Sequence, residues 1–173
     1  MKIEINNKFF DAAIIGGGLA GLSLSILLSK SGYQTILFEK EKYPFHRVCG
    51  EYISMESWKF IESLGLNLSQ LDLPIINKLI VSSPGGDFLQ FSLKPGGFGI
   101  SRYFLDDQLK KIAIQNGVII QQEAKVNEVI FQDEIFTIQY KGRLIECVIL
   151  NSTSTASRVK YDFLLEQFRR NLK

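Results

Sequence analysis

The sequence predicts an α/β fold in which a parallel sheet is built around an early strand, turn, helix and second strand. An apolar run at residues 9–15 leads directly into a glycine-rich turn. An apolar segment of helical length follows at 19–31, and a second apolar run at 33–38 ends on an acid, Glu39. Neighbouring parallel strands need a crossover connection, and a helix of this length supplies one.

The turn carries the pattern G-x-G-x-x-G on Gly16, Gly18 and Gly21. We expect Gly16 to let the chain turn tightly off the strand and Gly18 to let the backbone approach a pyrophosphate. Gly21, without a side chain, would let the helix lie against the sheet. The helix would then point its first N–H groups at the pyrophosphate, where the helix dipole favours an anion.

Glu39 follows the last of these glycines by 39 − 21 = 18 residues. An acid at about this spacing accepts hydrogen bonds from the adenosine ribose hydroxyls, and its charge would repel a 2′-phosphate. A glycine-rich turn without any ligand is the alternative interpretation of a lone motif. Here the motif stands in the required order of strand, turn, helix, strand and acid, so the sequence predicts a Rossmann-like site for FAD or NAD.

The bulk properties narrow the class of protein. The 173 residues suit one domain or part of a larger one. With 46% hydrophobic residues, 22% charged residues and a net charge of +2, the composition gives no case for a nucleic-acid surface. The two cysteines have no C-x-x-C spacing and there is a single histidine, so we expect neither a disulfide framework nor a metal site, and a cytoplasmic location is the default.

The apolar stretch at residues 12–28, with Lys2 and Lys8 upstream, has some features of a signal peptide or membrane anchor. Four glycines in it, Asp11 just before it, and a length below the roughly 20 residues that span a bilayer all favour a buried strand and helix. We therefore expect no transmembrane segment.

A polar loop follows at residues 40–51, punctuated by Pro44 and Gly50. An amphipathic helix is predicted over 54–64, and a turn or broken helical segment over 66–74.

Alternating residues at 75–81 and 88–93 flank a Pro-Gly-Gly turn, which predicts a β-hairpin inserted at about 75–95. Residues 94–100 are expected to be a second glycine-rich loop. Apolar positions at helical spacing then predict a helix over 103–115.

A short strand at residues 118–121 precedes an antiparallel meander, whose strands are expected at 124–131, 135–140 and 143–150. We expect the short strand and the end of the last strand to join the first two strands in a parallel sheet, with the meander covering one face. Residues 1–150 would then form one domain, followed by a polar and helical tail at 151–173.

Two further motifs point to a family. The loop R-V-C-G-E at residues 47–51 and the segment I-S-R-Y-F-L-D-D-Q-L at 100–109 accompany the glycine pattern and Glu39. Together they resemble the flavin-dependent oxidoreductases of the geranylgeranyl reductase group. This group belongs to the wider superfamily of aromatic-ring hydroxylases and flavin halogenases, and the resemblance covers roughly the first 150 residues.

The resemblance implies FAD as cofactor and places several residues around it. Arg47 would lie along the pyrophosphate, Cys49 and Gly50 beside the flavin ring, and Arg102 would reach the cofactor from the other side. From the residues alone, the alternative for Arg47 is a solvated loop cation, and a lone cysteine such as Cys49 is more often an inert small residue than a redox centre. Arg102 could instead pair with Asp106 one helical turn later.

Members of that family are roughly twice as long, and their second half supplies further flavin contacts and much of the substrate pocket. The resemblance therefore implies an incomplete, truncated FAD-binding domain and leaves catalysis by this chain alone open.

The first functional hypothesis is the FAD-binding portion of a flavin-dependent reductase or monooxygenase. It would act on a hydrophobic or aromatic small molecule, with NAD(P)H or another electron donor. The alternatives are a non-catalytic remnant or split subunit that needs a partner chain, and a small NAD-binding module. No catalytic residue is predicted, because the sequence shows no constellation of carboxylates or histidines that requires one.

Overall fold

A computed structural model describes residues 9–49 and 51–152, and the chain divides into two units. Unit 1 comprises residues 1–43 and 109–173, and unit 2 comprises residues 44–108. Helix α3 (Arg102–Gln115) contributes residues to both. The predicted hairpin insertion lies inside unit 2, whereas nearly all of the predicted tail lies outside the described residues.

Unit 1 is built on the parallel strands that the sequence predicts. β1 (Phe9–Ile15) pairs in parallel with β2 (Thr35–Phe38), and α1 (Leu19–Lys30) connects them. On the outer flank of β2, β6 (Ile119–Gln121) adds a third parallel strand. On the other flank of β1, the end of β9 (Arg143–Ser152) adds a fourth. The α/β fold with a parallel sheet is therefore confirmed.

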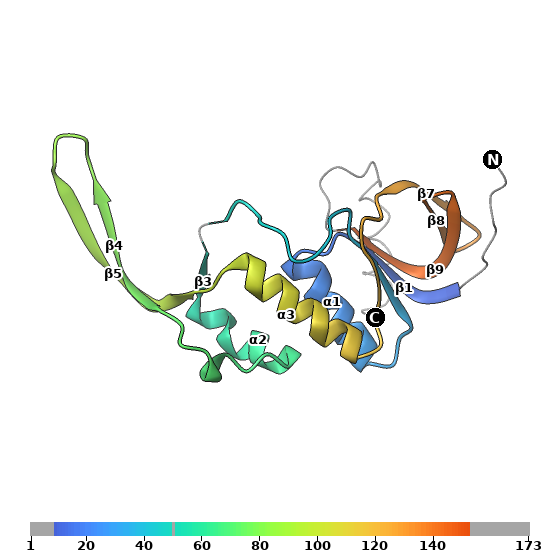
Figure 1. Ribbon diagram of the computed structural model, residues 1–173, viewed down its shortest axis with the longest axis horizontal. Helices are drawn as coiled ribbons and strands as arrows, with labels where there is room; N and C mark the ends of the chain where they lie inside the picture. Colours follow the sequence, from blue (N-terminus) through green and yellow to red (C-terminus); the bar gives the residue numbers. More distant parts are fainter. Residues whose placement is uncertain (1–8, 50, 153–173) are drawn as a thin grey trace. The chain divides into compact units, whose positions relative to one another are not determined.

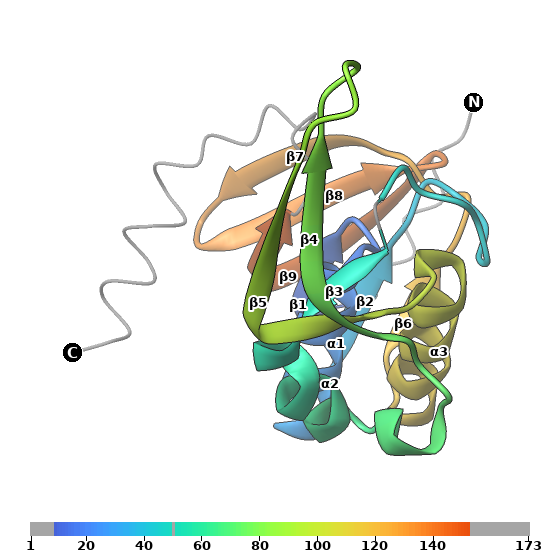
Figure 2. The same ribbon diagram turned by 90° about the vertical axis from the view of Figure 1, so that its left-hand side faces the viewer.

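The predicted meander is a continuation of the same sheet, in the order β6-β2-β1-β9-β8-β7. β7 (Val126–Gln132) and β8 (Ile135–Tyr140) are antiparallel to their neighbours, and β9 is shared between the two parts. Figure 2 shows these three strands as a curved antiparallel group. Because this group curves, Tyr140 of β8 contacts Phe38 of β2 edge-on, with ring centroids 4.7 Å apart. The meander thus covers one face, as predicted, while remaining hydrogen-bonded to the sheet that it covers.

One hydrophobic core joins the parallel and antiparallel strands of unit 1. On β2 and β8 its members are alternate residues, as expected for side chains that share one face of a strand. The buried residues of this core are Phe10, Ala13, Ile15, Ile36, Phe38, Ala124, Phe136, Ile138, Tyr140, Ile145, Cys147 and Leu150.

Unit 2 holds a second, three-stranded sheet in the order β3-β5-β4. Its strands are β3 (Tyr52–Ser54), β4 (Ile75–Ser82) and β5 (Phe88–Gly99). A single turn of 3-10 helix, Met55–Ser57, leads into α2 (Trp58–Leu64), and a second 3-10 turn, Leu68–Gln70, occupies the segment predicted to be broken helix.

The prediction of a glycine-rich loop at residues 94–100 is wrong, because β5 continues to Gly99. The glycines of this stretch allow close pairing between strands and do not mark a loop. A Cβ atom on Gly97 would collide with the carbonyl oxygen of Ile53 and the ring of Tyr52, both on β3. Only glycine therefore lets β5 approach β3 this closely.

The hairpin formed by β4 and the first half of β5 projects from the rest of unit 2 as a two-stranded ribbon (Figure 1). Six of its large apolar side chains are 46% to 66% exposed. They are Leu79, Ile80, Val81, Phe88, Leu89 and Phe91, and we call this set the apolar hairpin surface.

Candidate functional site

The glycine turn at the carboxyl end of β1 has the geometry that its motif predicts. Gly16 has a φ of +106°, in the region that favours glycine, and its N–H donates to the carbonyl oxygen of Phe38 at 2.8 Å. A Cβ atom on Gly21 would collide with the carbonyl oxygen of Gly16 and lie 3.3 Å from Cγ2 of Ile14. The first turn of α1 therefore packs directly on β1.

Gly18 immediately precedes α1 and differs from the other two glycines of the motif. Its backbone is extended, and a Cβ atom there would meet no atom within 4 Å. Within the described part of the chain, no side chain caps this end of α1 and no acidic residue lies in its first turn. The first N–H groups of a helix lack intrahelical partners and attract anions, so the open side of Gly18 suits a phosphate.

Glu39 lies directly beside the turn and is only 4% exposed. Its Oε2 accepts a hydrogen bond from the N–H of Gly17 at 2.8 Å, and its Oε1 accepts one from the N–H of Glu41 at 3.0 Å. The N–H of Glu39 donates to the carbonyl oxygen of Gln121 at 2.9 Å, which extends the pairing of β2 with β6. The carboxylate thus joins the end of β2 to the glycine turn.

Tyr43 is a part of this site that the sequence did not reveal. It is 5% exposed, and its hydroxyl group donates a hydrogen bond to the carbonyl oxygen of Gly17. No local pattern indicates this contact, because it spans 26 residues and begins in a segment that reads as an irregular loop.

In unit 2, Arg47 and Arg102 converge on one buried carboxylate. Arg102 Nε lies 2.9 Å from Oδ1 of Asp106, and Arg102 Nη2 lies 3.1 Å from Oδ2. Arg47 Nε donates to the same Oδ2 at 3.1 Å, and its guanidinium also covers the ring of Phe45 at 4.4 Å. The side chain of Asp106 is 3% exposed. Asp106 thus organises both predicted arginines, and the sequence identified it only as an alternative partner of Arg102.

The electrostatics of this cluster favour charged arginine. Burial alone would lower the pKa of Arg102, but the hydrogen bond and negative charge of Asp106, with a smaller contribution from Cys49, raise that pKa above its ordinary value. Two guanidinium groups share one carboxylate, so the three side chains carry a net positive charge that suits an anionic ligand. Cys49 is exposed and lies within hydrogen-bonding reach of Arg102. Gly50 lies outside the described residues.

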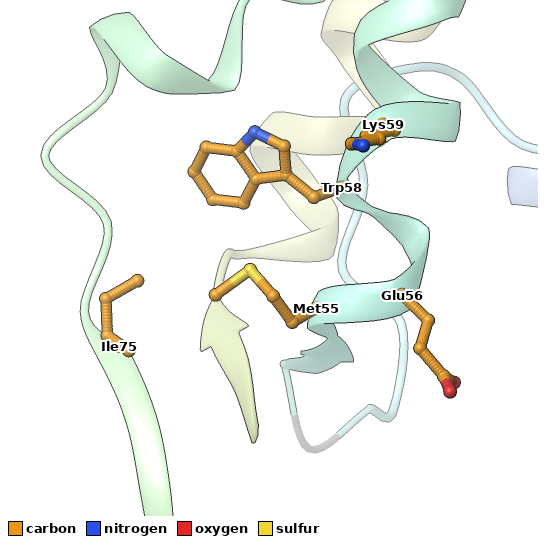
Figure 3. Close-up of a pocket in the computed structure, with 5 residues that line it drawn as sticks. All are labelled: Met55, Glu56, Trp58, Lys59 and Ile75. Carbon is orange, nitrogen blue, oxygen red and sulfur yellow. The ribbon is translucent and has the colours of Figure 1, made fainter. Parts of the chain in front are cut away.

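A separate apolar pocket of about 440 Å³ occurs elsewhere in unit 2. Figure 3 shows Trp58 and Met55 facing Ile75 across it, while the carboxylate of Glu56 points away from the space between them. Glu56 and Lys59 complete the lining. The ring of Trp58 also meets Phe98 edge-on, with centroids 5.0 Å apart. None of the predicted site residues lines this pocket.

The described residues include no group of three or more His, Cys, Asp or Glu side chains placed to hold a metal ion. Among the helices of the described chain, none combines the length and the apolar character needed to cross a membrane.

The structure therefore groups the predicted residues into two sets. Gly16, Gly18, Gly21 and Glu39 meet in unit 1, where Tyr43 joins them. Arg47 and Arg102 meet at Asp106 in unit 2, and Cys49 lies beside Arg102. Their roles toward a cofactor remain predictions.

Comparison with known proteins identifies a family for most of the chain. A family model described as "FAD binding domain" matches residues 10–137. The 1H-pyrrole-2-carbonyl-(peptidyl-carrier protein) brominase of Pseudoalteromonas luteoviolacea is 33% identical over 132 residues, covering 73% of this chain and 31% of the brominase. Sulochrin halogenase of Aspergillus terreus is 26% identical over 88% of this chain and 31% of that enzyme. The chain thus spans about a third of the length of these curated relatives.

Solved structures share the fold. p-Nitrophenol 4-monooxygenase from Pseudomonas putida superposes with a TM-score of 0.76 at 16% identity, covering 88% of this chain and 43% of that enzyme. A flavin-dependent brominase superposes with a TM-score of 0.71 at 23% identity, covering 93% and 41% of the two chains.

Proposed function

This chain belongs to the FAD binding domain family, and from that membership we propose that its glycine turn holds the ADP half of FAD within a flavin-dependent oxidoreductase. The observation that carries the proposal is the open side of Gly18 at the uncapped amino end of α1, where a Cβ atom would have no neighbour within 4 Å. The pyrophosphate would lie there, because the N–H groups of the first turn can donate to it.

Under the same proposal, Glu39 both holds the glycine turn and binds the cofactor. Its carboxylate already fixes Gly17, and it would also accept hydrogen bonds from the adenosine ribose. Arg47 and Arg102 would balance the negative charge of the cofactor, and Cys49 and Gly50 would lie toward its flavin ring, as the resemblance implies. When bound, FAD supplies the electron-transfer chemistry, whereas the protein binds, orients and shields it.

For the substrate we propose a hydrophobic or aromatic small molecule, with electrons supplied by NAD(P)H or another donor. The names of sulochrin halogenase and p-nitrophenol 4-monooxygenase support an aromatic substrate for those enzymes. A narrower relationship to geranylgeranyl reductases remains a prediction from the R-V-C-G-E loop.

A second candidate function is that of one subunit of a split flavoprotein. Its partner chain would cover the apolar hairpin surface. The apolar hairpin surface favours it, because a two-stranded ribbon is marginally stable by itself in water. This candidate predicts weak flavin binding by the chain alone.

One experiment tests both candidates. The purified chain is incubated with FAD, free cofactor is removed, and the flavin absorbance is measured per chain. About one flavin per chain is expected if the chain holds FAD by itself. A folded chain that retains no flavin would contradict this proposal and leave the split-subunit candidate.

Two matched variants locate the bound cofactor. Gly18→Val fills the open side of the turn and should abolish retention, whereas Gly85→Val, in the exposed hairpin turn of unit 2, should not change it. Equal retention by both variants would place the flavin elsewhere.

A further inference from the structure

Tyr43 is held in place at three points in unit 1. Its N–H donates to Oε1 of Gln122 at 2.9 Å, and the ammonium group of Lys110 lies 5.9 Å from the centre of its ring. Its hydroxyl donates to the carbonyl oxygen of Gly17. With only 5% of its surface exposed, Tyr43 is buried and contacts the glycine turn through its hydroxyl group.

Gly17 is consequently fixed through both of its backbone polar groups. Its N–H donates to Glu39 and its carbonyl oxygen accepts from Tyr43. The space where a side chain of residue 17 would project is filled by the hydroxyl of Tyr43, and Cβ of Glu39 lies 3.0 Å from that position. The two peptide units on either side of Gly17 are therefore each held by a hydrogen bond, the first to Glu39 and the second to Tyr43.

We propose that Tyr43 is a positioning residue for dinucleotide binding, which holds the glycine turn in its binding conformation before the cofactor arrives. This inference rests on the proposed function. A flexible turn must be ordered when it binds, and that ordering lowers affinity, whereas a turn that is already ordered avoids the loss. Tyr43 would act through Gly17, without a contact of its own to the pyrophosphate.

The first test compares Tyr43→Phe with the wild-type chain. The variant keeps the ring and loses only the hydroxyl group, and we expect it to weaken FAD binding about three- to tenfold, the usual effect of one neutral hydrogen bond. Tyr33→Phe is the matched control, because the side chain of Tyr33 is 44% exposed. FAD affinity should be unchanged in this control.

A second measurement needs no cofactor. Hydrogen–deuterium exchange of the peptide covering residues 16–22 should be faster in Tyr43→Phe than in wild type, and unchanged in Tyr33→Phe. A purely structural role would lower the melting temperature without raising exchange selectively at the turn. Unchanged exchange at residues 16–22 would overturn the inference.

A double-mutant cycle tests whether Tyr43 acts on FAD binding through Gly17. Gly17→Ala should weaken FAD binding because its Cβ displaces Tyr43 or the turn. Combined with Tyr43→Phe, the loss should be smaller than the product of the two separate losses, because both changes break the same contact. Independent effects would overturn the inference. A wild-type chain that binds no FAD would instead overturn the proposed function, and the exchange experiment would still decide the role of Tyr43.

Discussion

Cys147 is the residue at which the two kinds of strand pairing in unit 1 meet. It is opposite Phe10 in the parallel ladder and opposite Phe136 in the antiparallel one. Burial raises the pKa of its thiol to about 12, although a hydrogen bond with the backbone of Ala13 opposes this shift. Any thiolate at this position would therefore lie in the middle of the core.

This burial predicts an alkaline loss of stability. The folded-state pKa of this thiol lies above its ordinary value of 9.0, so the stability that the neutral thiol contributes is complete below about pH 9 and is lost as pH rises toward about 12. Between about pH 8 and about pH 10, the free energy of unfolding should fall by about 1.4 kcal/mol more in wild type than in Cys147→Ala. Urea titrations at both pH values measure this difference, and parallel pH profiles would contradict it.

Asp106 provides a second prediction at the residue scale. Asp106→Asn leaves two partly buried guanidinium groups without their carboxylate, and we expect a loss of about 2 kcal/mol in the free energy of unfolding. Asp87→Asn, in the exposed hairpin turn, is the matched control and should change it by less than about 0.5 kcal/mol. Chemical denaturation measures both, and similar values for the two variants would show that Asp106 does not stabilise the loop and helix.

The residues that the sequence revealed and those that it missed differ in the range of their contacts. The glycine motif and the acid at residue 39 follow from local order, since β1, α1 and β2 are consecutive. Asp106 contacts Arg47 across 59 residues. No periodicity carries that information, although the i,i+4 spacing of Arg102 and Asp106 was a usable signal for half of the cluster.

At the scale of elements, residues 94–100 show why composition misleads. Glycine and proline clusters usually mark turns, and this stretch holds Pro95 and three glycines. Here residue 97 must be glycine because β3 lies close against the backbone of β5 at this point. The residues of β3 precede Gly97 by more than forty positions in the sequence. This stretch is a strand because of its pairing with β3, which a short sequence window around residues 94–100 does not contain.

The hairpin of β4 and β5 carries a prediction about solubility. Leu79 and Phe91 are a directly opposed pair on one face of the ribbon, and both are about half exposed. Replacing both by threonine keeps strand propensity and removes apolar surface. We expect less aggregation by light scattering, a melting temperature within a few degrees of wild type, and unchanged FAD retention.

A large fall in melting temperature in this double variant would mean that the pair stabilises unit 2. An equivalent double replacement by threonine at the exposed, polar Lys78 and the opposing Ser92 should leave aggregation unchanged, because little apolar surface is removed there.

For the whole molecule, the proposed site predicts that ligand binding slows hydrogen exchange in unit 1 and does not change it in the hairpin of unit 2. ADP alone should protect amide hydrogens at residues 16–22 and 39–43 in unit 1, because it carries the pyrophosphate and the ribose. It should leave residues 78–91 of the hairpin unchanged. Hydrogen–deuterium exchange with and without ADP measures this pattern. Protection of the hairpin, or none at the glycine turn, would contradict the placement of the ADP half.

The shared strand β9 also matters while the chain is being made. β1 can pair with β2 soon after residue 38 is synthesised, but its other edge must wait for β9, since Phe10 pairs with Cys147, which is synthesised 147 − 38 = 109 residues later. At typical translation speeds of about 5–20 residues per second, this delay is roughly 5 to 22 seconds. During that interval the nascent chain carries an apolar strand with one open edge outside the ribosome. The rate of elongation therefore sets how long this edge is open to pairing with other nascent chains.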